Sequence, residues 1–512
     1  MVYTEGFLMR KLPIFVLCGI LFANGYANAD YAYIEDDTKF VNGILYDSNG
    51  DAVTGVYEEF YENNIKKSEM PYVDGVLNGV GTLYDEDGNK AADMPFVNGK
   101  LEGVVLTYYN DGKMKERIPY KNGKIQGVKR SYFPNGNVQA RVRYEGSVQS
   151  GEAKEYYEDG QLKEVYTYNN GQKQGPAKVY FYDGIVAEEF NYVGDNISGE
   201  RKVYYHSGQP KSVISYAFGK KNGKMKKYFE NGNLEAEIPY KNDELDGEGT
   251  FYNEDGTLNL TVTYNDDVRN GMAKAYYPDG KVKVTVNYDN DVKNGVEKEY
   301  YENGTVKAEL PYQKGVVEGI GREYYENSGL KMEMPYVNSL ASGIAKFYDE
   351  SGKLTTEAVY KKGKKDGVQK EYNSEGVQIA ESIYQDDLLN GEYKEFYDDG
   401  KIKSTANYEN GMLEGLSLVY DEEGNLAYEV PYVKNRKEGK VKRYYPSGKV
   451  MGEVSYEKGK KHGMLDAYNE DETLMAKVLF NKDEAIKGYS LDHGNNPVLM
   501  SAEDLELINK AY

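Results

Sequence analysis

The chain of 512 residues combines a formal net charge of -21 with 53 tyrosines, 56 glycines and no tryptophan. Its acidity opposes nucleic acid and anionic membrane surfaces as partners, because both carry charge of the same sign. The length would allow three or four ordinary domains, but only 39% of the residues are hydrophobic, so tyrosine must supply much of any buried surface.

Residues 1–29 have the pattern of a secretory signal peptide. Basic residues precede an apolar run over 12–22, and Ala27 and Ala29 form a small-residue cleavage site. The apolar run is too short to span a membrane comfortably, so we expect cleavage after Ala29 and export. Cys18 is the only cysteine of the chain, so the exported protein would contain neither a thiol nor a disulfide.

After an N-terminal capping segment over 30–54, residues 55–486 are predicted to form eighteen tandem repeats of 24 residues. Starting at Gly55, a glycine recurs every 24 residues until Gly463. Counting each register glycine as position 0, positions 5 and 17 are aromatic in every repeat, as Tyr84 and Phe96 are in the repeat of Gly79. A period of this length is typical of stacked repeat architectures.

Each repeat is predicted to form one β-hairpin. In the repeat of Gly295, Asn303-Gly304 is the signal for a tight turn that needs positive φ. The second connection is expected to be longer, and position 20 always carries Gly, Asp, Asn or Ser, which tolerate a left-handed turn. A single hairpin buries too little surface to be stable, so the predicted fold is all-β: an elongated, solenoid-like meander of about 18 stacked hairpins with a short C-terminal helical cap.

The segments "GVEKEYYENGTVKAELPYQKG" and "GKKHGMLDAYNEDETLMAKVLF" resemble the MORN-repeat variant of bacteria, over residues 55 to about 480. The resemblance implies β-hairpin arrays that serve as scaffolds and interaction surfaces without known catalysis. Some relatives of this kind are labelled antitoxins. "YDEDGNK" and "YDEEGNL" are also similar to YD repeats, which build shells around cargo, but the strict 24-residue period fits those repeats less well.

Position 6 is aromatic in twelve repeats and Asp or Asn in six. Neighbouring residues on a strand point to opposite faces, so position 6 should face outward if position 5 is buried. Exposed aromatic arrays suit sugar rings or partner proteins, while the alternative is that these rings only shield the sheet and its turns. The predicted binding residues form an aromatic stripe over six consecutive repeats: Tyr109, Phe133, Tyr157, Phe181, Tyr205 and Phe229.

The repeat pattern ends after Phe480, and residues 487–512 are predicted to form a C-terminal cap. Ser501 and Asp504 are spaced like a capping box before Leu505 and Ile508. We expect a short helix there that covers the last open hairpin.

No set of residues in this sequence has the spacing typical of a catalytic or metal site. The three histidines, His206, His462 and His493, lack a partner at metal-ligand spacing, and the acidic turns lack the calcium-loop pattern. No phosphate-binding glycine motif precedes a helix. We therefore expect a non-enzyme with no metal, no cofactor and no catalytic residue.

The sequence favours an exported protein-interaction or adhesion surface on or outside a bacterial cell. The alternatives are a carbohydrate- or cell-wall-binding array and a periplasmic scaffold. The expected partner is a protein or cell surface, with a basic partner favoured by the acidity and a glycan as the alternative. We expect neither nucleic-acid binding nor membrane insertion, a monomer, and a location at the cell surface or outside the cell, with the periplasm as alternative.

Overall fold

The computed structural model describes residues 33–34, 38–491 and 496–511. The predicted signal peptide and His493 lie outside the described residues. The chain divides into two compact units, the first ending at Glu244 and the second beginning at Leu245. Each unit is described by itself.

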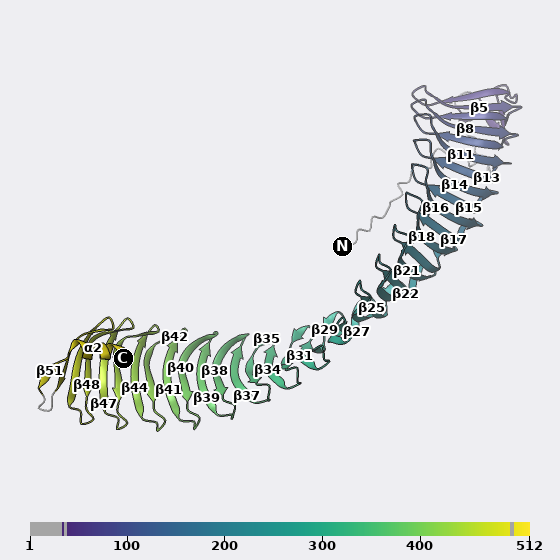
Figure 1. The fold of residues 1–512 in the computed structure, drawn as a ribbon. Coiled ribbons are helices and arrows are strands. Elements are labelled where there is room, and N and C mark those ends of the chain that lie inside the picture. Colours follow the sequence, from purple (N-terminus) through teal and green to yellow (C-terminus); the bar gives the residue numbers. More distant parts are fainter. Residues whose placement is uncertain (1–32, 35–37, 492–495, 512) are drawn as a thin grey trace. The chain divides into compact units, whose positions relative to one another are not determined.

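In the first unit, strand follows strand along the sequence with antiparallel pairing (Figure 1). A separate three-stranded sheet lies in the predicted N-terminal segment and precedes the repeat array, which begins at Gly55. The separate sheet consists of β1 (Tyr33–Ile34), β2 (Thr38–Val41) and β3 (Ile44–Tyr46). The strands of the array are β4 (Gly55–Phe60), β5 (Lys66–Val73), β6 (Val76–Leu77), β7 (Gly79–Tyr84), β8 (Lys90–Val97), β9 (Lys100–Leu101), β10 (Gly103–Tyr108), β11 (Met114–Lys121), β12 (Lys124–Ile125), β13 (Gly127–Tyr132), β14 (Val138–Glu145), β15 (Val148–Tyr156), β16 (Leu162–Asn169), β17 (Gln172–Tyr180), β18 (Val186–Val193), β19 (Asn196–Ile197), β20 (Gly199–Tyr204), β21 (Pro210–Ala217), β22 (Lys220–Tyr228) and β23 (Leu234–Lys241).

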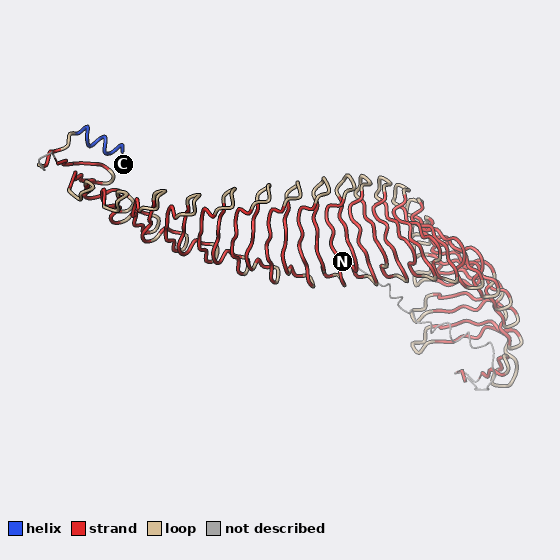
Figure 2. Tube along the Cα trace, turned by 90° about the horizontal axis from the view of Figure 1, so that it is seen from below, coloured by secondary structure: helices blue, strands red, loops and turns tan. Residues whose placement is uncertain are grey.

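The second unit continues the same pattern after β24 (Glu244–Leu245) and ends in a helix (Figure 2, blue). Its strands are β25 (Gly247–Tyr252), β26 (Leu258–Asn265), β27 (Val268–Tyr276), β28 (Val282–Asp289), β29 (Val292–Lys293), β30 (Gly295–Tyr300), β31 (Val306–Gln313), β32 (Val316–Val317), β33 (Gly319–Tyr324), β34 (Leu330–Val337), β35 (Leu340–Ala341), β36 (Gly343–Tyr348), β37 (Leu354–Lys361), β38 (Lys364–Tyr372), β39 (Gln378–Gln385), β40 (Leu388–Phe396), β41 (Ile402–Glu409), β42 (Met412–Leu413), β43 (Gly415–Tyr420), β44 (Leu426–Val433), β45 (Arg436–Lys437), β46 (Gly439–Tyr444), β47 (Val450–Glu457), β48 (Lys460–Tyr468), β49 (Leu474–Asn481), β50 (Glu484–Leu491) and β51 (Pro497–Leu499). The helix is α2 (Ala502–Ala511).

Each 24-residue repeat forms one antiparallel hairpin, so the predicted fold class is confirmed. In the repeat of Gly295, strand β30 pairs with β31, and position 0 lies opposite position 17, Tyr312. The ladder then continues from β31 to the first long strand of the next repeat, where Glu309 lies opposite Arg322. Because each hairpin pairs with the next one, backbone hydrogen bonding supplies the stability that a single hairpin lacks.

The first connection of each hairpin is a three-residue loop with one left-handed residue. In the repeat of Gly295, the Tyr301 N–H donates to the Thr305 carbonyl at 2.9 Å, and the Gly304 N–H donates to the Tyr301 carbonyl at 2.9 Å. Gly304 has φ of 90°, whereas Asn303 is not among the residues with positive φ. The Asn303 side chain instead accepts a hydrogen bond from the Thr305 N–H at 2.8 Å. This is the glycine-bulge loop, and asparagine acts here as a side-chain cap.

The second connection is the shorter one, so the expectation that it would be longer is wrong. Lys314 and Gly315 have φ of 49° and 84°, which makes this a two-residue type I′ turn. The residues after the turn pair at once with the preceding strand as β32, and a bulge follows before Gly319. From the sequence, the residues of β32 were expected to belong to a loop. The predicted left-handed conformation at position 20 is confirmed.

Position 20 also joins each hairpin to the preceding one. The Asp387 N–H donates to the Lys365 carbonyl at 2.9 Å, and one Asp387 carboxylate oxygen accepts from the Lys365 N–H at 2.8 Å. Repeats with glycine at position 20 make only the backbone bond, as Gly363 does with Ala341. The side-chain hydrogen bond therefore offsets the strain of a left-handed residue that is not glycine.

One face of the sheet carries the core. In the first unit, Ala153, Tyr166, Ala177 and Phe190 form a buried cluster from positions 2 and 15 of two repeats. Burial raises the pKa of the Tyr166 phenol, whose hydroxyl donates to Glu155 at 3.0 Å. The aromatic rings of position 17, such as Tyr168 and Tyr192, pack against this cluster, and alanine fills the positions between large rings. The rings of position 5 lie on the other face of the sheet, where the Tyr204 hydroxyl donates to Glu189 at position 14 over 2.9 Å.

The predicted C-terminal helix is confirmed in α2. The Ser501 hydroxyl and the Asp504 carboxylate are hydrogen-bonded at 2.7 Å, and the Asp504 N–H donates to the Ser501 hydroxyl at 3.1 Å. Leu505 and Ile508 pack against the buried cluster that includes Phe480. The helix therefore covers apolar surface that the last hairpin would otherwise expose to water. Among the described residues, no helix has the length and apolar character to cross a membrane.

Candidate functional site

The aromatic stripe predicted from the sequence lies along the first-turn edge of the hairpins and is half-buried. The Tyr109 hydroxyl donates to the backbone carbonyl of Tyr132, at position 5 of the next repeat, over 2.6 Å. Tyr157 and Tyr205 make the same bond at 2.8 Å. All nine tyrosines at position 6 share this bond: Tyr61, Tyr109, Tyr157, Tyr205, Tyr277, Tyr301, Tyr325, Tyr397 and Tyr445.

Lysine side chains cover the rings of this stripe. The ammonium of Lys163 lies 5.9 Å from the ring centre of Tyr157, and that of Lys211 lies 5.5 Å from the ring centre of Tyr205. Position 12 is lysine in eight of the nine repeats that have tyrosine at position 6, and in none of the other repeats. The sequence therefore contained a signal that these tyrosines are paired within their own hairpin.

The stripe thus differs from the exposed surface expected from strand alternation. Position 6 lies at the start of the turn, where successive turns pack on each other, so the ring lies between neighbours instead of facing water. Phe133, Phe181 and Phe229 are half-buried at the same position without the hydroxyl bond. A binding role for the six residues stays a prediction.

Where position 6 is Asp or Asn, the side chain hydrogen-bonds within its own turn: Asn253 and Asn469 donate to a threonine hydroxyl, and the other four cap backbone N–H groups. Asp85 accepts hydrogen bonds from the N–H groups of Asp87 at 3.0 Å and Asn89 at 2.8 Å. Asn373 accepts in the same way from Glu375 and Val377. The two residue classes at position 6 are therefore alternative ways to hold the turn: a bond to the next repeat, or a local cap.

Two turn tips of the first unit break this pattern with exposed rings. Tyr182 stacks on Tyr157 with ring centres 3.9 Å apart, and its side chain is 63% exposed. His206 packs on Phe181 at 5.0 Å between ring centres, and its Nε2 lies 2.8 Å from a carboxylate oxygen of Asp183. Other repeats carry mostly glutamate at this position. Other exposed rings lie elsewhere, as Phe218 does in a second turn and Phe60 in the first repeat, so these two tips are the exposed aromatic surface next to the stripe.

The structure shows a second candidate surface, which the sequence did not predict. In five consecutive repeats of the second unit, position 1 is an aliphatic side chain that is 37% to 57% exposed. These residues, the aliphatic ridge, are Met272, Val296, Ile320, Ile344 and Val368. Directly opposite the last four of them lie further apolar residues, half-buried on the same face: Pro311, Pro335, Val359 and Ile383. Met272 lies opposite Asn287.

The corresponding row in the first unit is shorter. Val56 and Val80 are exposed at position 1, but Val104 and Val128 are half-buried and the next repeats carry Glu152 and a proline. A signal for the ridge is present in the sequence as glycine followed directly by a large aliphatic residue in successive repeats. Which face of the sheet remains uncovered could not be read from that pattern.

Beside the ridge, two residues further along each strand, runs a row of cations on the same face. Position 3 is basic in six consecutive repeats: Lys274, Lys298, Arg322, Lys346, Lys370 and Lys394. Lys298 pairs across the ladder with Glu309 at 2.8 Å, and Arg322 pairs with Glu333 at 3.0 Å. Hydrogen bonds from Lys298 and from the Tyr324 hydroxyl lower the pKa of Glu309, despite the opposing effect of burial.

In these pairs the cation is the more exposed partner. The Lys298 side chain is 40% exposed and that of Glu309 is 21% exposed. The pairs of Arg322 and Lys346 show the same order. Lys274 lies opposite Thr285, so it faces no carboxylate across the ladder. The more exposed charges beside the ridge are therefore cations, although the chain as a whole is acidic.

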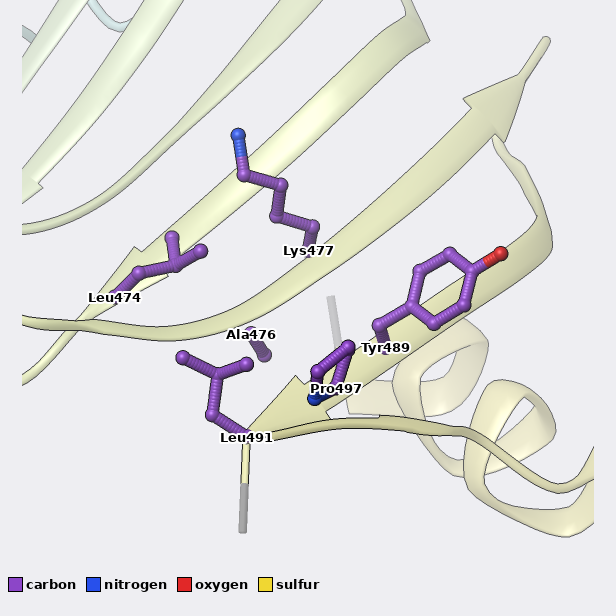
Figure 3. A pocket seen from close by; sticks show the side chains of 6 residues that line it. All are labelled: Leu474, Ala476, Lys477, Tyr489, Leu491 and Pro497. Carbon is purple, nitrogen blue, oxygen red and sulfur yellow. The ribbon is translucent and has the colours of Figure 1, made fainter. Parts of the chain in front are cut away.

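A shallow, open pocket of about 430 Å³ lies at the tips of two first turns and is lined by Tyr325, Glu326, Asn327 and Glu350. A second pocket, of about 270 Å³ at the end of the array, is lined by side chains of β49, β50 and β51, among them Leu474, Leu491 and Pro497 (Figure 3). This volume is below the ~300–1,000 Å³ of ordinary ligand sites. Within 33–34, 38–491 and 496–511, no group of three or more His, Cys, Asp or Glu residues could hold a metal ion.

Comparison with known proteins identified one family. The family described as "MORN repeat variant" matches well over half of the chain, in fourteen segments: 53–74, 101–122, 125–145, 149–170, 197–217, 221–242, 245–266, 269–290, 293–314, 317–338, 341–362, 389–410, 413–434 and 437–458. No relative was found among curated protein sequences.

Solved structures with some similarity come from toxin complexes. A crystal structure of TcdB2-TccC3 is 11% identical, with 87% of this chain and 27% of that chain covered and a TM-score of 0.13. The Photorhabdus luminescens Tc holotoxin pore with a TccC3 mutation is 12% identical, with 92% and 28% covered and a TM-score of 0.14. The chain spans less than a third of the length of these structures. Scores this low carry no argument about function.

Proposed function

Because the chain belongs to the MORN repeat variant family, we propose that it is an exported, non-catalytic scaffold that binds a protein partner on or outside a bacterial cell. The observation that carries this proposal is the aliphatic ridge. Five aliphatic side chains, each about half exposed, leave roughly 300 Å² of apolar surface in one row. Exposed apolar surface of this extent marks interaction sites, because leaving it in water is costly.

The proposal that the chain is non-catalytic is supported by the structural roles of its carboxylates, which form ion pairs, accept tyrosine hydrogen bonds or cap turns. The carboxylates beside the ridge are held by cations and tyrosine hydroxyls, as Glu309 is by Lys298 and Tyr324. Many turn carboxylates cap their own turns, as Asp85 does. Such groups stabilise the array, and none is poised against a nucleophile or a second base in an enclosed cavity.

The location outside the cytoplasm is supported by the signal-peptide pattern over residues 1–29. Cys18 belongs to that segment, so the exported chain would be free of cysteine. A hairpin array held by backbone pairing and inter-repeat hydrogen bonds needs no disulfide for stability. Fractionation of cells that produce the chain tests this part, and retention in the cytoplasm with residues 1–29 uncleaved would contradict it.

A sedimentation assay tests the binding function. The purified chain from residue 30 is mixed with cells of the producing bacterium, foreign host cells or purified peptidoglycan. We expect it to sediment with one type of cell and to be released when protein on those cells is digested by protease. The double variant Ile320→Ser with Ile344→Ser should bind at least tenfold more weakly, because two apolar contacts of ~1 kcal/mol or more are lost.

The matched control is Val56→Ser with Val80→Ser, which alters the same repeat position in the first unit. It should bind like the unaltered chain. Equal loss of binding in both double variants, or binding that is indifferent to both, would contradict a role for the ridge.

Carbohydrate binding is the second candidate, and one observation favours it. Tyr182 presents an exposed ring supported by stacking on Tyr157, as a platform for a sugar ring requires. Sedimentation with peptidoglycan that is lost in Tyr182→Ser and retained in the ridge variant would support this candidate over the first.

A further inference from the structure

We propose that the aliphatic ridge receives an acidic amphipathic helix of the partner protein. The apolar stripe of the helix would lie along the ridge, and its carboxylates would meet the cations at position 3. This inference rests on the proposed function and names the chemistry of the partner.

The backbone arrangement favours a helix over an extended strand. The ridge lies on the face of the sheet, not at an edge, and its strands are paired on both sides: β30 pairs with β28 and β31, and β33 with β31 and β34. A partner strand would find no free backbone N–H or carbonyl groups to pair with. A helix satisfies its own backbone hydrogen bonds and docks through side chains alone.

The spacing of the ridge fits a helix that crosses the strands. From Val296 to Ile383, eight successive long strands each contribute one apolar residue. Strands lie ~4.8 Å apart, so these residues span roughly 34 Å. An amphipathic helix presents an apolar residue every ~3.5 residues, or about every 5.2 Å. A helix of about 22 residues therefore places one apolar side chain near each strand.

The cations beside the ridge favour acidic residues on both sides of the apolar stripe of the bound helix. The cations of position 3 project further into solvent than the carboxylates they pair with, as in Lys298 and Glu309. Lys274 faces threonine across the ladder. Glutamates on a bound helix would meet these cations, whereas lysines would meet like charge. The shorter row of the first unit has Glu58 and Thr82 at position 3, so it lacks the basic neighbours.

Binding of designed peptides tests the inference. The probe is a fluorescent peptide of about 22 residues with leucine at heptad positions a and d and glutamate at e and g. A second peptide has lysine in place of glutamate. Fluorescence anisotropy with the purified chain at physiological salt is expected to show at least tenfold tighter binding of the glutamate peptide. Ile320→Ser with Ile344→Ser should weaken that binding at least tenfold.

Two further variants separate charge from apolar contact and from folding. Lys298→Gln with Lys346→Gln removes the two exposed cations that pair with Glu309 and Glu357 and leaves Arg322 and Lys370 in place, and it should reduce the preference for the glutamate peptide. Val56→Ser with Val80→Ser should change nothing, and circular dichroism confirms that each variant keeps its sheet.

The outcomes distinguish this inference from the proposed function. If the lysine peptide binds more tightly and in a manner that depends on Ile320 and Ile344, the acidic partner is overturned while the ridge remains a binding surface. If neither peptide responds to the ridge variants, the helix inference is overturned. Loss of cell binding in the ridge variant would still support the proposed function in that case.

Discussion

Removing the hydroxyl of Tyr301 tests how the repeats are joined. In Tyr301→Phe, the backbone carbonyl of Tyr324 in the next repeat loses a donor that lies 2.8 Å away in a half-buried setting. A hydrogen bond of this kind contributes ~1 kcal/mol. Because a long repeat array does not unfold in one cooperative step, the effect should be local, and a single unfolding free energy would not report it.

Hydrogen exchange measures this local effect. A loss of ~1 kcal/mol corresponds to about fivefold faster exchange of amides that open with the contact. We expect that increase in peptides covering the turn of Tyr301 and the adjoining turn of Tyr325, and nowhere else. Phe133→Tyr should add the missing bond to the carbonyl of Tyr156 and slow exchange by a similar factor.

The matched control is Tyr182→Phe. The Tyr182 hydroxyl shows no hydrogen bond within the described part of the chain, so its removal should leave exchange unchanged. Equal acceleration in Tyr182→Phe and Tyr301→Phe, or none in either, would refute the inter-repeat role of position 6.

Three further perturbations test other parts of the account. Burial raises the pKa of Tyr72 to about 12, so the stability that its neutral phenol contributes is present below pH ~10 and lost as the pH rises through 12. Difference titration of the unaltered chain against Tyr72→Phe isolates this phenol from the other tyrosines, and its tyrosinate should form near pH 12 together with local loss of the sheet; a difference centred near pH 10 would contradict this. Gly367→Ala should lower the melting temperature, because φ is 134° and the new Cβ would lie 2.8 Å from the Cβ of Val359; an unchanged melting curve would show that the site relaxes freely. Ser501→Ala should cost α2 ~1 kcal/mol of capping energy and speed exchange in the helix, since both bonds of the Ser501 hydroxyl with Asp504 are lost, and unaltered exchange there would contradict the cap.

The hairpin array could be predicted because its determinants are local. The 24-residue period, the aromatic positions and the left-handed residue at position 20 each follow from residue types at fixed spacing. The capping helix was predicted for the same reason, since Ser501 and Asp504 lie within one helical turn of each other.

The features that could not be predicted depend on contacts between repeats. Strand alternation indicates that positions 5 and 6 point to opposite faces. The Tyr109 hydroxyl, however, donates to the backbone of the next hairpin. A rule about single strands does not include that neighbouring hairpin. The relative length of the two turns depends on where pairing resumes after Gly315, which propensity does not reveal.

The ridge could not be predicted for a related reason. Val296 and the buried residues of the opposite face are both aliphatic, and a single-layer sheet offers water two faces. Alternation separates the two sets but does not say which set is covered by neighbouring side chains. On the core face, side chains cover the rings, as the Lys293 ammonium does 4.8 Å from the ring centre of Tyr312, whereas the ridge residues stay exposed.

Protection of single cysteines tests the central claim, that the ridge is the binding surface. Cys18 is the only cysteine and lies in the predicted signal peptide, so Ile344→Cys and Tyr182→Cys each introduce one thiol into the exported chain. The rate of maleimide labelling is measured with and without the cells that the chain binds. The account predicts at least tenfold slower labelling at position 344 on binding and an unchanged rate at position 182. Protection at position 182 with free labelling at position 344 would contradict it.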